Sequence, residues 1–251
     1  MSLPAAPVAP AIRRRPAGMS RRVACGNRLI DALPRSARAR LLAAGKRVDL
    51  RPGLVLCEPG QRIRHAWFPL EGFLGLSTHP SHPARMEVDL VGNEGMLGAA
   101  LVLGVAEASQ RALVLGAGVA LRIDAATLRR ELQRVRALRR LLNRYVYVLM
   151  MQFLQNSTCV ASHKIEQRLA RLLLMSQDRA RAEALNITQA SLAEMLGVRR
   201  VGVTEAAGAL QRLGYIRYSR GRVAVTDRAG LERAACGCYR AVRASHQRWL
   251  G

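Results

Sequence analysis

The chain has 251 residues, half of them hydrophobic, and carries 40 lysines and arginines against 17 aspartates and glutamates. The formal charge of +23 favours a polyanionic partner such as DNA or RNA, although arginine is abundant throughout and does not locate the binding surface. The hydrophobic fraction excludes a largely disordered chain, and no run approaches the roughly 20 apolar residues of a membrane-spanning helix. A cytoplasmic protein with one large or two small domains is expected.

The first half of the chain predicts a basic arm followed by an antiparallel β-domain. Residues 1–22 are rich in proline, alanine and arginine without periodicity, which is typical of a disordered arm. Short helices are expected over 27–44, around Pro34. The candidate strands are residues 48–50, 53–57, 66–69, 72–77, 86–91, 112–115 and 119–123. Short strands separated by turn signals at this spacing indicate a sandwich or barrel, so residues 23–133 are expected to form one domain.

A long helix is predicted over residues 134–162, after a short one over 125–132, because glycine and proline are absent from it. Within it a seam recurs at alternating intervals of four and three residues: Leu138, Leu142, Tyr145, Leu149, Gln152 and Asn156. This spacing is typical of a coiled coil, so the seam is expected to meet a second chain, with the two polar residues setting the register. The alternative is a helix that packs only within its own subunit.

Residues 163–240 predict a small domain built on a winged helix-turn-helix. After a helix over 164–175, Thr188 is a suitable N-cap for a helix that Gly197 ends, because glycine adopts the left-handed C-cap conformation readily. A second helix runs from near Arg199 to Gly214, and so short a turn makes the two helices cross steeply. Strands over 215–218 and 222–225 then form the wing. A helical hairpin without a nucleic-acid role is the alternative.

The end of the chain and its cysteines carry little signal. The segment after Asp227 is expected to be helical, and residues 241–251 to be a frayed basic tail. An odd number of cysteines argues against a disulfide framework, and Cys236-Gly237-Cys238 is tighter than zinc-ribbon spacing. Iron–sulfur binding requires clustered cysteines, which the sequence does not show. We therefore expect structural or incidental thiols, with no metal and no cofactor.

A β-domain, a long helix and a winged helix in this order resemble the Crp/Fnr family of bacterial transcription regulators. The resemblance covers residues 27–240. It is most specific at 187–232, ITQASLAEMLGVRRVGVTEAAGALQRLGYIRYSRGRVAVTDRAGLE, and weaker at VGNEGMLG, residues 91–98. It implies a jelly-roll sensory barrel and a homodimer that places two recognition helices in successive major grooves, about 34 Å apart. It also allows RNA polymerase as a further partner.

The resemblance places the DNA contacts residue by residue. Base contacts fall on Arg200, Val201 and Glu205, where Arg200 suits guanine and Glu205 suits cytosine. The expected phosphate contacts, which position the protein without specifying sequence, are Thr188, Arg199, Arg220 and Arg222.

The effector pocket implied by the resemblance departs from the family's cyclic-nucleotide pattern. Its expected residues are Gly95, Met96, Gly98, Arg111 and Phe153. Methionine stands where the ribose-binding glutamate is expected, Ala112 replaces the phosphate-binding serine, and Phe153 and Leu154 occupy the positions of the hydroxyl residues that meet the base. Each unpaired polar group of a buried nucleotide costs about 1–3 kcal/mol, so cyclic AMP binding is not expected. A pocket rebuilt for another ligand and an empty structural barrel stay open.

Other classes of function remain as alternatives. Haem binding stays open in principle, although isolated histidines beside prolines are more typical of loops than of haem ligands. The candidate ligands are Cys57, His65, His79 and His82. A nonspecific arginine-rich protein that coats nucleic acid would show no operator specificity. An enzyme is not expected, because the sequence has no Walker loop, metal-ligand spacing or nucleophile–base–acid constellation.

Overall fold

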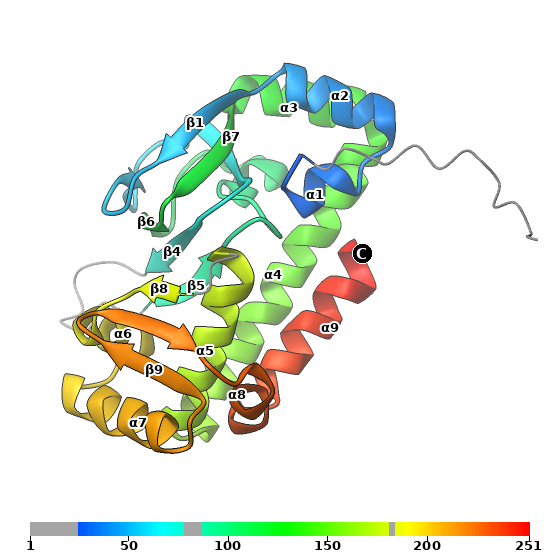
Figure 1. Ribbon diagram of the computed structural model, residues 1–251. Helices are drawn as coiled ribbons and strands as arrows, with labels where there is room; N and C mark the ends of the chain where they lie inside the picture. Colours follow the sequence, from blue (N-terminus) through cyan, green and yellow to red (C-terminus); the bar gives the residue numbers. More distant parts are fainter. Residues whose placement is uncertain (1–24, 78–86, 181–183) are drawn as a thin grey trace, which may run out of the picture.

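A computed structural model describes residues 25–77, 87–180 and 184–251 (Figure 1). Its first half contains α1 Arg28–Asp31, α2 Arg35–Ala43, β1 Lys46–Leu50, β2 Val55–Cys57, β3 His65–Pro69, β4 Phe73–Ser77, β5 Glu87–Val91, the 3-10 helix η1 Ala99–Leu103, β6 Arg111–Gly116, β7 Gly118–Asp124 and α3 Ala125–Arg134. Each predicted strand is confirmed to within two residues at either end. The expected arm at 1–22 lies outside the described residues.

The strands form two antiparallel sheets, with the orders β1-β7-β3 and β2-β6-β4-β5. Side chains from both sheets, among them Trp67, Leu74 and Val114, share one buried cluster, so the core of this double-sheet domain lies between the sheets. The N-terminal helices are tied to it by the buried Asn27. Its side chain caps α1 and donates hydrogen bonds of 2.9 Å to the carbonyl oxygens of Pro69 and Gly95.

The long helix α4 spans Arg136–Ser162 and extends from the double-sheet domain to the winged helix (Figure 1). The helix was predicted correctly, but the seam predicted to face a second chain is wrong. Leu138, Leu142, Tyr145 and Gln152 are buried inside their own subunit. Leu149 packs against the buried cluster that α1, α2, α3 and α4 share with β3 and β7, and Asn156 accepts a hydrogen bond from Arg171 of the same chain. This face of α4 therefore packs within its own subunit, which was the alternative to a dimer seam.

The second half contains α5 Ile165–Ala180, β8 Ala184–Asn186, α6 Gln189–Leu196, α7 Arg200–Arg212, β9 Ile216–Ser219, β10 Arg222–Val225, α8 Arg228–Ala234 and α9 Cys238–Leu250. The wing strands are confirmed, and β8, which was not predicted, adds a third strand in the order β8-β10-β9. One continuous core joins α5, α6, α7 and this sheet. Its apolar contacts hold α7 in a defined orientation.

The C-terminal helix α9 lies along α4 (Figure 1). The prediction of a frayed tail over 241–251 is therefore wrong. Tyr239 and Val242 are buried, the rings of Trp249 and Tyr147 meet edge to face at 5.2 Å, and His246 Nε2 lies 3.1 Å from Gln152 Oε1. The predicted single helical segment after Asp227 is in fact broken at residues 235–237, between α8 and α9. Within the described residues, no helix is both long and apolar enough to span a bilayer.

Candidate nucleic-acid interface and effector cavity

The first helix of the helix-turn-helix, α6, is capped as its sequence predicts. Thr188 Oγ1 accepts a hydrogen bond of 3.1 Å from the Ser191 backbone N–H, which satisfies one of the free donors at the helix start. Gly197 ends the helix with a φ of 63°, a conformation that glycine adopts without strain. These two local signals fix the turn that leads into α7.

The second helix, α7, separates an apolar face from a polar one. Val203, Ala206 and Leu210 are buried against α5 and α6. The opposite face exposes Arg200, Val201 and Glu205, and Val201 is 66% exposed although it is apolar. The structure thus brings all the predicted base-reading residues onto one free face at the helix start.

Two polar residues on this surface were missed by sequence reasoning. Thr204 Oγ1 donates to Gln189 Oε1 at 2.9 Å and so connects α7 with the first turn of α6. Both lie beside the predicted base-reading residues, since Thr204 is adjacent in sequence to Glu205 and its hydroxyl also meets the Arg200 carbonyl at 3.1 Å. Thr204 continues the helical spacing of residues 200, 201 and 205, whereas its contact with Gln189 depends on how α6 and α7 cross.

The wing is a tight hairpin whose tip lies near the start of α6. Arg220 and Gly221 have φ values of 47° and 75°, the pair of positive values expected of a two-residue type I′ turn. A Cβ at Gly221 would lie 3.6 Å from Thr188 Cγ2. Arg220 and Arg222 are exposed, as are Thr188 and Arg199. The tip therefore places its arginines beside another of the predicted phosphate contacts.

Tyr218 links the wing to the rest of this surface. Its hydroxyl donates to the Ile187 carbonyl oxygen at 3.0 Å. Burial raises the pKa of Tyr218, while the positive charge of Arg200 acts in the opposite direction. Tyr218 therefore joins the wing to the residue that precedes Thr188, the N-cap of α6.

A cavity of about 660 Å³ lies between the double-sheet domain and α4. Its lining includes three of the residues predicted for the effector pocket: Met96, Gly98 and Phe153. Apolar side chains from α4, Leu149 and Met150 among them, complete one wall. The cavity has the position and size of a small-molecule site.

The other two residues predicted for the pocket, Gly95 and Arg111, are not among those that line the cavity. Arg111 Nε donates to Glu58 Oε1 at 3.1 Å, so a neighbouring carboxylate already neutralises its charge. A Cβ at Gly95 would come within 2.3 Å of the Tyr145 hydroxyl oxygen. That buried hydroxyl accepts from the Met96 N–H at 3.0 Å and donates to the Met96 carbonyl at 3.2 Å, and burial raises the pKa of Tyr145. Gly95 therefore makes room for the anchor between α4 and the glycine-rich loop.

Of the candidate ligands for haem, Cys57 and His65 both line the cavity, and each has a protein partner. His65 lines the cavity, but its Nε2 lies 3.2 Å from Asp124 Oδ1. Cys57 Sγ donates to the Gln110 carbonyl oxygen at 3.6 Å. His79 and His82 lie outside the described residues.

The expectation that the cysteines do not cluster is wrong. Cys159, Cys236 and Cys238 form a buried group at the junction of α4, α8 and α9, and His163 joins them. The four side chains come as two close pairs, Cys159 with His163 and Cys236 with Cys238, and only the fold brings the two distant pairs together.

Comparisons with known proteins agree with this geometry. The Crp-like helix-turn-helix domain family matches residues 167–234. No curated protein matches the sequence significantly. Among solved structures, a Crp-family transcriptional regulator from Thermus thermophilus is 19% identical with a TM-score of 0.62, the alignment covering 76% of this chain and 96% of that one.

Two further structures share the fold. A putative cAMP-binding regulatory protein from Silicibacter pomeroyi is 16% identical with a TM-score of 0.59, over 82% of this chain and 94% of the other. The c-di-GMP-responsive regulator CLP from Xanthomonas campestris is 16% identical with a TM-score of 0.58, over 76% and 99%. The chain therefore carries a Crp-like helix-turn-helix DNA-binding domain on the fold of the Crp/Fnr family of transcriptional regulators.

Proposed function

We propose that the protein is a homodimeric, sequence-specific transcription regulator that reads a near-palindromic operator. The observation that carries this proposal is the exposed start of α7, where Arg200, Val201 and Glu205 share one face beside the arginines of the wing. Arginine can bind guanine through two hydrogen bonds and a glutamate can accept from cytosine, so this face suits direct reading of bases.

The dimer surface is proposed to be the exposed stripe of α4, in place of the seam expected from the sequence. Along this stripe Asn143, Tyr147, Met150, Leu154 and Ser157 recur at intervals of four and three residues. Tyr147, Met150 and Leu154 are 43, 57 and 63% exposed. Partly exposed apolar side chains in coiled-coil spacing favour pairing with the same helix of a second chain, beside the contact that Tyr147 makes with Trp249 of its own chain.

The cavity is proposed as the effector site. Met150 belongs both to its lining and to the exposed stripe, so a ligand bound there would touch the side chains that meet the second chain. The mainly apolar wall that α4 contributes favours a ligand with an apolar body over cyclic AMP. Isothermal titration with cyclic AMP is expected to give no binding heat, and micromolar binding would contradict this part of the proposal.

Selection from randomised DNA tests the function. A common motif should emerge, and competition should show that it binds at least about 1,000-fold more tightly than random DNA at physiological salt. A coating protein would instead show strong salt dependence and no preferred sequence. That result would replace the proposed function with the nonspecific alternative, which the basic charge of the chain also favours.

A further inference from the structure

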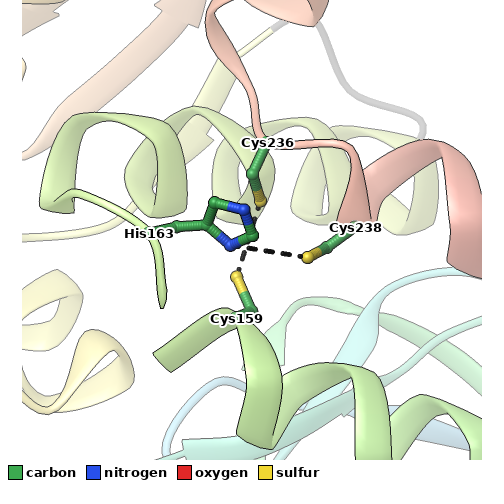
Figure 2. Close-up of side chains that lie close together, drawn as sticks. All are labelled: Cys159, His163, Cys236 and Cys238. Carbon is green, nitrogen blue, oxygen red and sulfur yellow. Dashed lines mark hydrogen bonds between the residues drawn. The ribbon is translucent and has the colours of Figure 1, made fainter. Parts of the chain in front are cut away.

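Four side chains that can bind a metal converge where the long helix meets the C-terminal helix (Figure 2). Cys159 lies in the last turn of α4, and His163 is the residue that ends this helix. Cys236 lies in the break between α8 and α9, and Cys238 is the first residue of α9. The three sulfurs and the imidazole nitrogen all lie within 4.8 Å of one another and point toward a common centre.

The spacing of these atoms fits a single tetrahedral ion. Cys159 Sγ lies 3.5 Å from Cys236 Sγ, and Cys238 Sγ lies 3.7 Å from His163 Nδ1. Zinc bonds of about 2.3 Å to sulfur and about 2.0 Å to nitrogen place two tetrahedral sulfurs about 3.8 Å apart and a sulfur–nitrogen pair about 3.6 Å apart. In an iron–sulfur cluster some of the four ligands bind different irons and lie further apart, whereas all four atoms here lie within 4.8 Å of one another.

The donor set and its burial select the class of metal. Cys159, Cys236 and Cys238 are only 2, 4 and 3% exposed, and His163 is partly buried. Three thiolates and one imidazole are the ligands of a structural zinc site, whereas magnesium and calcium require oxygen ligands. All four coordination positions are filled by protein, so the site is closed and suits a structural role.

The surroundings are suited to the negative charge of three thiolates. Gln155 Nε2 donates to Cys238 Sγ at 3.1 Å. The buried Arg171 lines the same hollow as Cys159, and its Nε has no hydrogen-bond partner among the described residues. Three thiolates around a divalent ion leave a net charge of −1, which the guanidinium balances. Beside three neutral thiols, the buried guanidinium would have no negative charge to balance.

We propose that Cys159, His163, Cys236 and Cys238 bind one Zn²⁺ ion that clamps the end of α4 to the α8–α9 junction. Binding releases three protons, one from each thiol, and His163 binds as neutral imidazole through Nδ1. Because His163 stands between α4 and α5, the clamp fixes the joint from which the winged helix departs. The metal thereby holds the DNA-binding domain in place on the long helix. This inference does not depend on operator binding.

The metal content of the purified full-length protein is the direct test. Elemental analysis after dialysis should give about one zinc per chain, with neither iron nor acid-labile sulfide. The apoprotein, prepared with a chelator under reducing conditions, should bind one equivalent of Co²⁺ and develop the intense visible absorption of tetrahedral thiolate coordination. Chelation should also lower the unfolding temperature by about 5 °C or more, because metal binding energy contributes to folding.

Variants separate this site from the other thiols. Cys236→Ser and His163→Ala should each reduce zinc to less than about half an equivalent. The matched controls Cys25→Ser and Cys57→Ser replace partly buried thiols outside the cluster and should retain full zinc. Equal zinc loss in a control and a ligand variant would overturn the assignment.

The test remains decisive if a ligand variant does not fold. Wild-type protein that contains no zinc and does not bind added Zn²⁺ or Co²⁺ overturns the proposal. So does stoichiometric iron with sulfide. A Cys159–Cys236 disulfide found by mass spectrometry in protein kept under reducing conditions also overturns it, because an oxidised pair cannot supply the thiolates.

Discussion

At the residue scale, Arg200 carries the specific part of the proposed function. It is exposed at the start of α7, on the same face as Val201 and Glu205. Local signals were sufficient to predict the helix that carries Arg200, because helix caps and glycine turns depend on neighbours in the sequence, whereas its base-reading role comes from the family resemblance. Thr204 and Gln189 were missed, since their contact joins two helices whose crossing only the fold defines.

Replacement of Arg200 by alanine should weaken binding to the selected operator by about 1–3 kcal/mol and relax one base position. The reason is the loss of two hydrogen bonds to one guanine. Competition binding with operators varied at each position measures this. Arg212→Ala, at the exposed other end of the same helix, serves as the control. Equal loss on operator and random DNA would show that Arg200 contacts only phosphates.

His246 makes stability depend on pH. Burial lowers its pKa from 6.5 to about 4, so the folded protein keeps the imidazole neutral where the unfolded chain binds a proton. Its contribution to stability is therefore present above pH 6.5 and is lost as pH falls to 4. Asp89 has the opposite effect on stability, because burial raises its pKa to about 6. The two effects partly cancel, so the free energy of unfolding of the wild type alone would change little with pH.

The His246→Gln variant isolates the histidine contribution. The free energy of unfolding of wild type minus that of His246→Gln should rise by about 2 kcal/mol between pH 4 and pH 7. Urea denaturation at both pH values measures it, and Asp89 is common to both proteins. A difference that stays constant with pH would show that His246 has an ordinary pKa.

At the scale of elements, α4 and α9 show where sequence periodicity stops being informative. Intervals of four and three residues occur on two faces of α4, one containing Leu142 and Tyr145 and the other Tyr147 and Met150. Periodicity predicted the helix, but only tertiary packing decides that the first face is buried. The start of α9 fell inside the predicted helical segment, but the rest of the helix was taken for a frayed tail, because its arginines masked His246 and Trp249, which contact α4.

Tyr145→Phe tests the anchor between α4 and the glycine-rich loop. The variant keeps the ring but removes the hydroxyl oxygen that accepts a hydrogen bond from the buried Met96 N–H. The free energy of unfolding should therefore fall by about 1–3 kcal/mol. Urea denaturation is the measurement. Tyr147→Phe changes a half-exposed hydroxyl on the same helix and should alter stability by less than about 0.5 kcal/mol. Equal effects would exclude the anchor.

At the scale of the whole molecule, the exposed stripe of α4 makes the predicted dimer testable. Leu154→Asp places a charge in the proposed interface and should weaken dimerisation at least about 100-fold, since burying an unpaired charge is costly. Sedimentation equilibrium measures the association. Val105→Asp, at another exposed apolar position, should leave it unchanged. A Leu154→Asp protein that remains dimeric would place the interface elsewhere.

The central claim is that two copies of α7 read successive major grooves. Hydroxyl-radical footprinting of the selected operator tests it most directly. The account predicts two protected regions related by two-fold symmetry, with centres about 34 Å or one helical turn apart. Arg200→Ala should weaken both equally. A single protected region, or uniform protection along the DNA, would contradict the account.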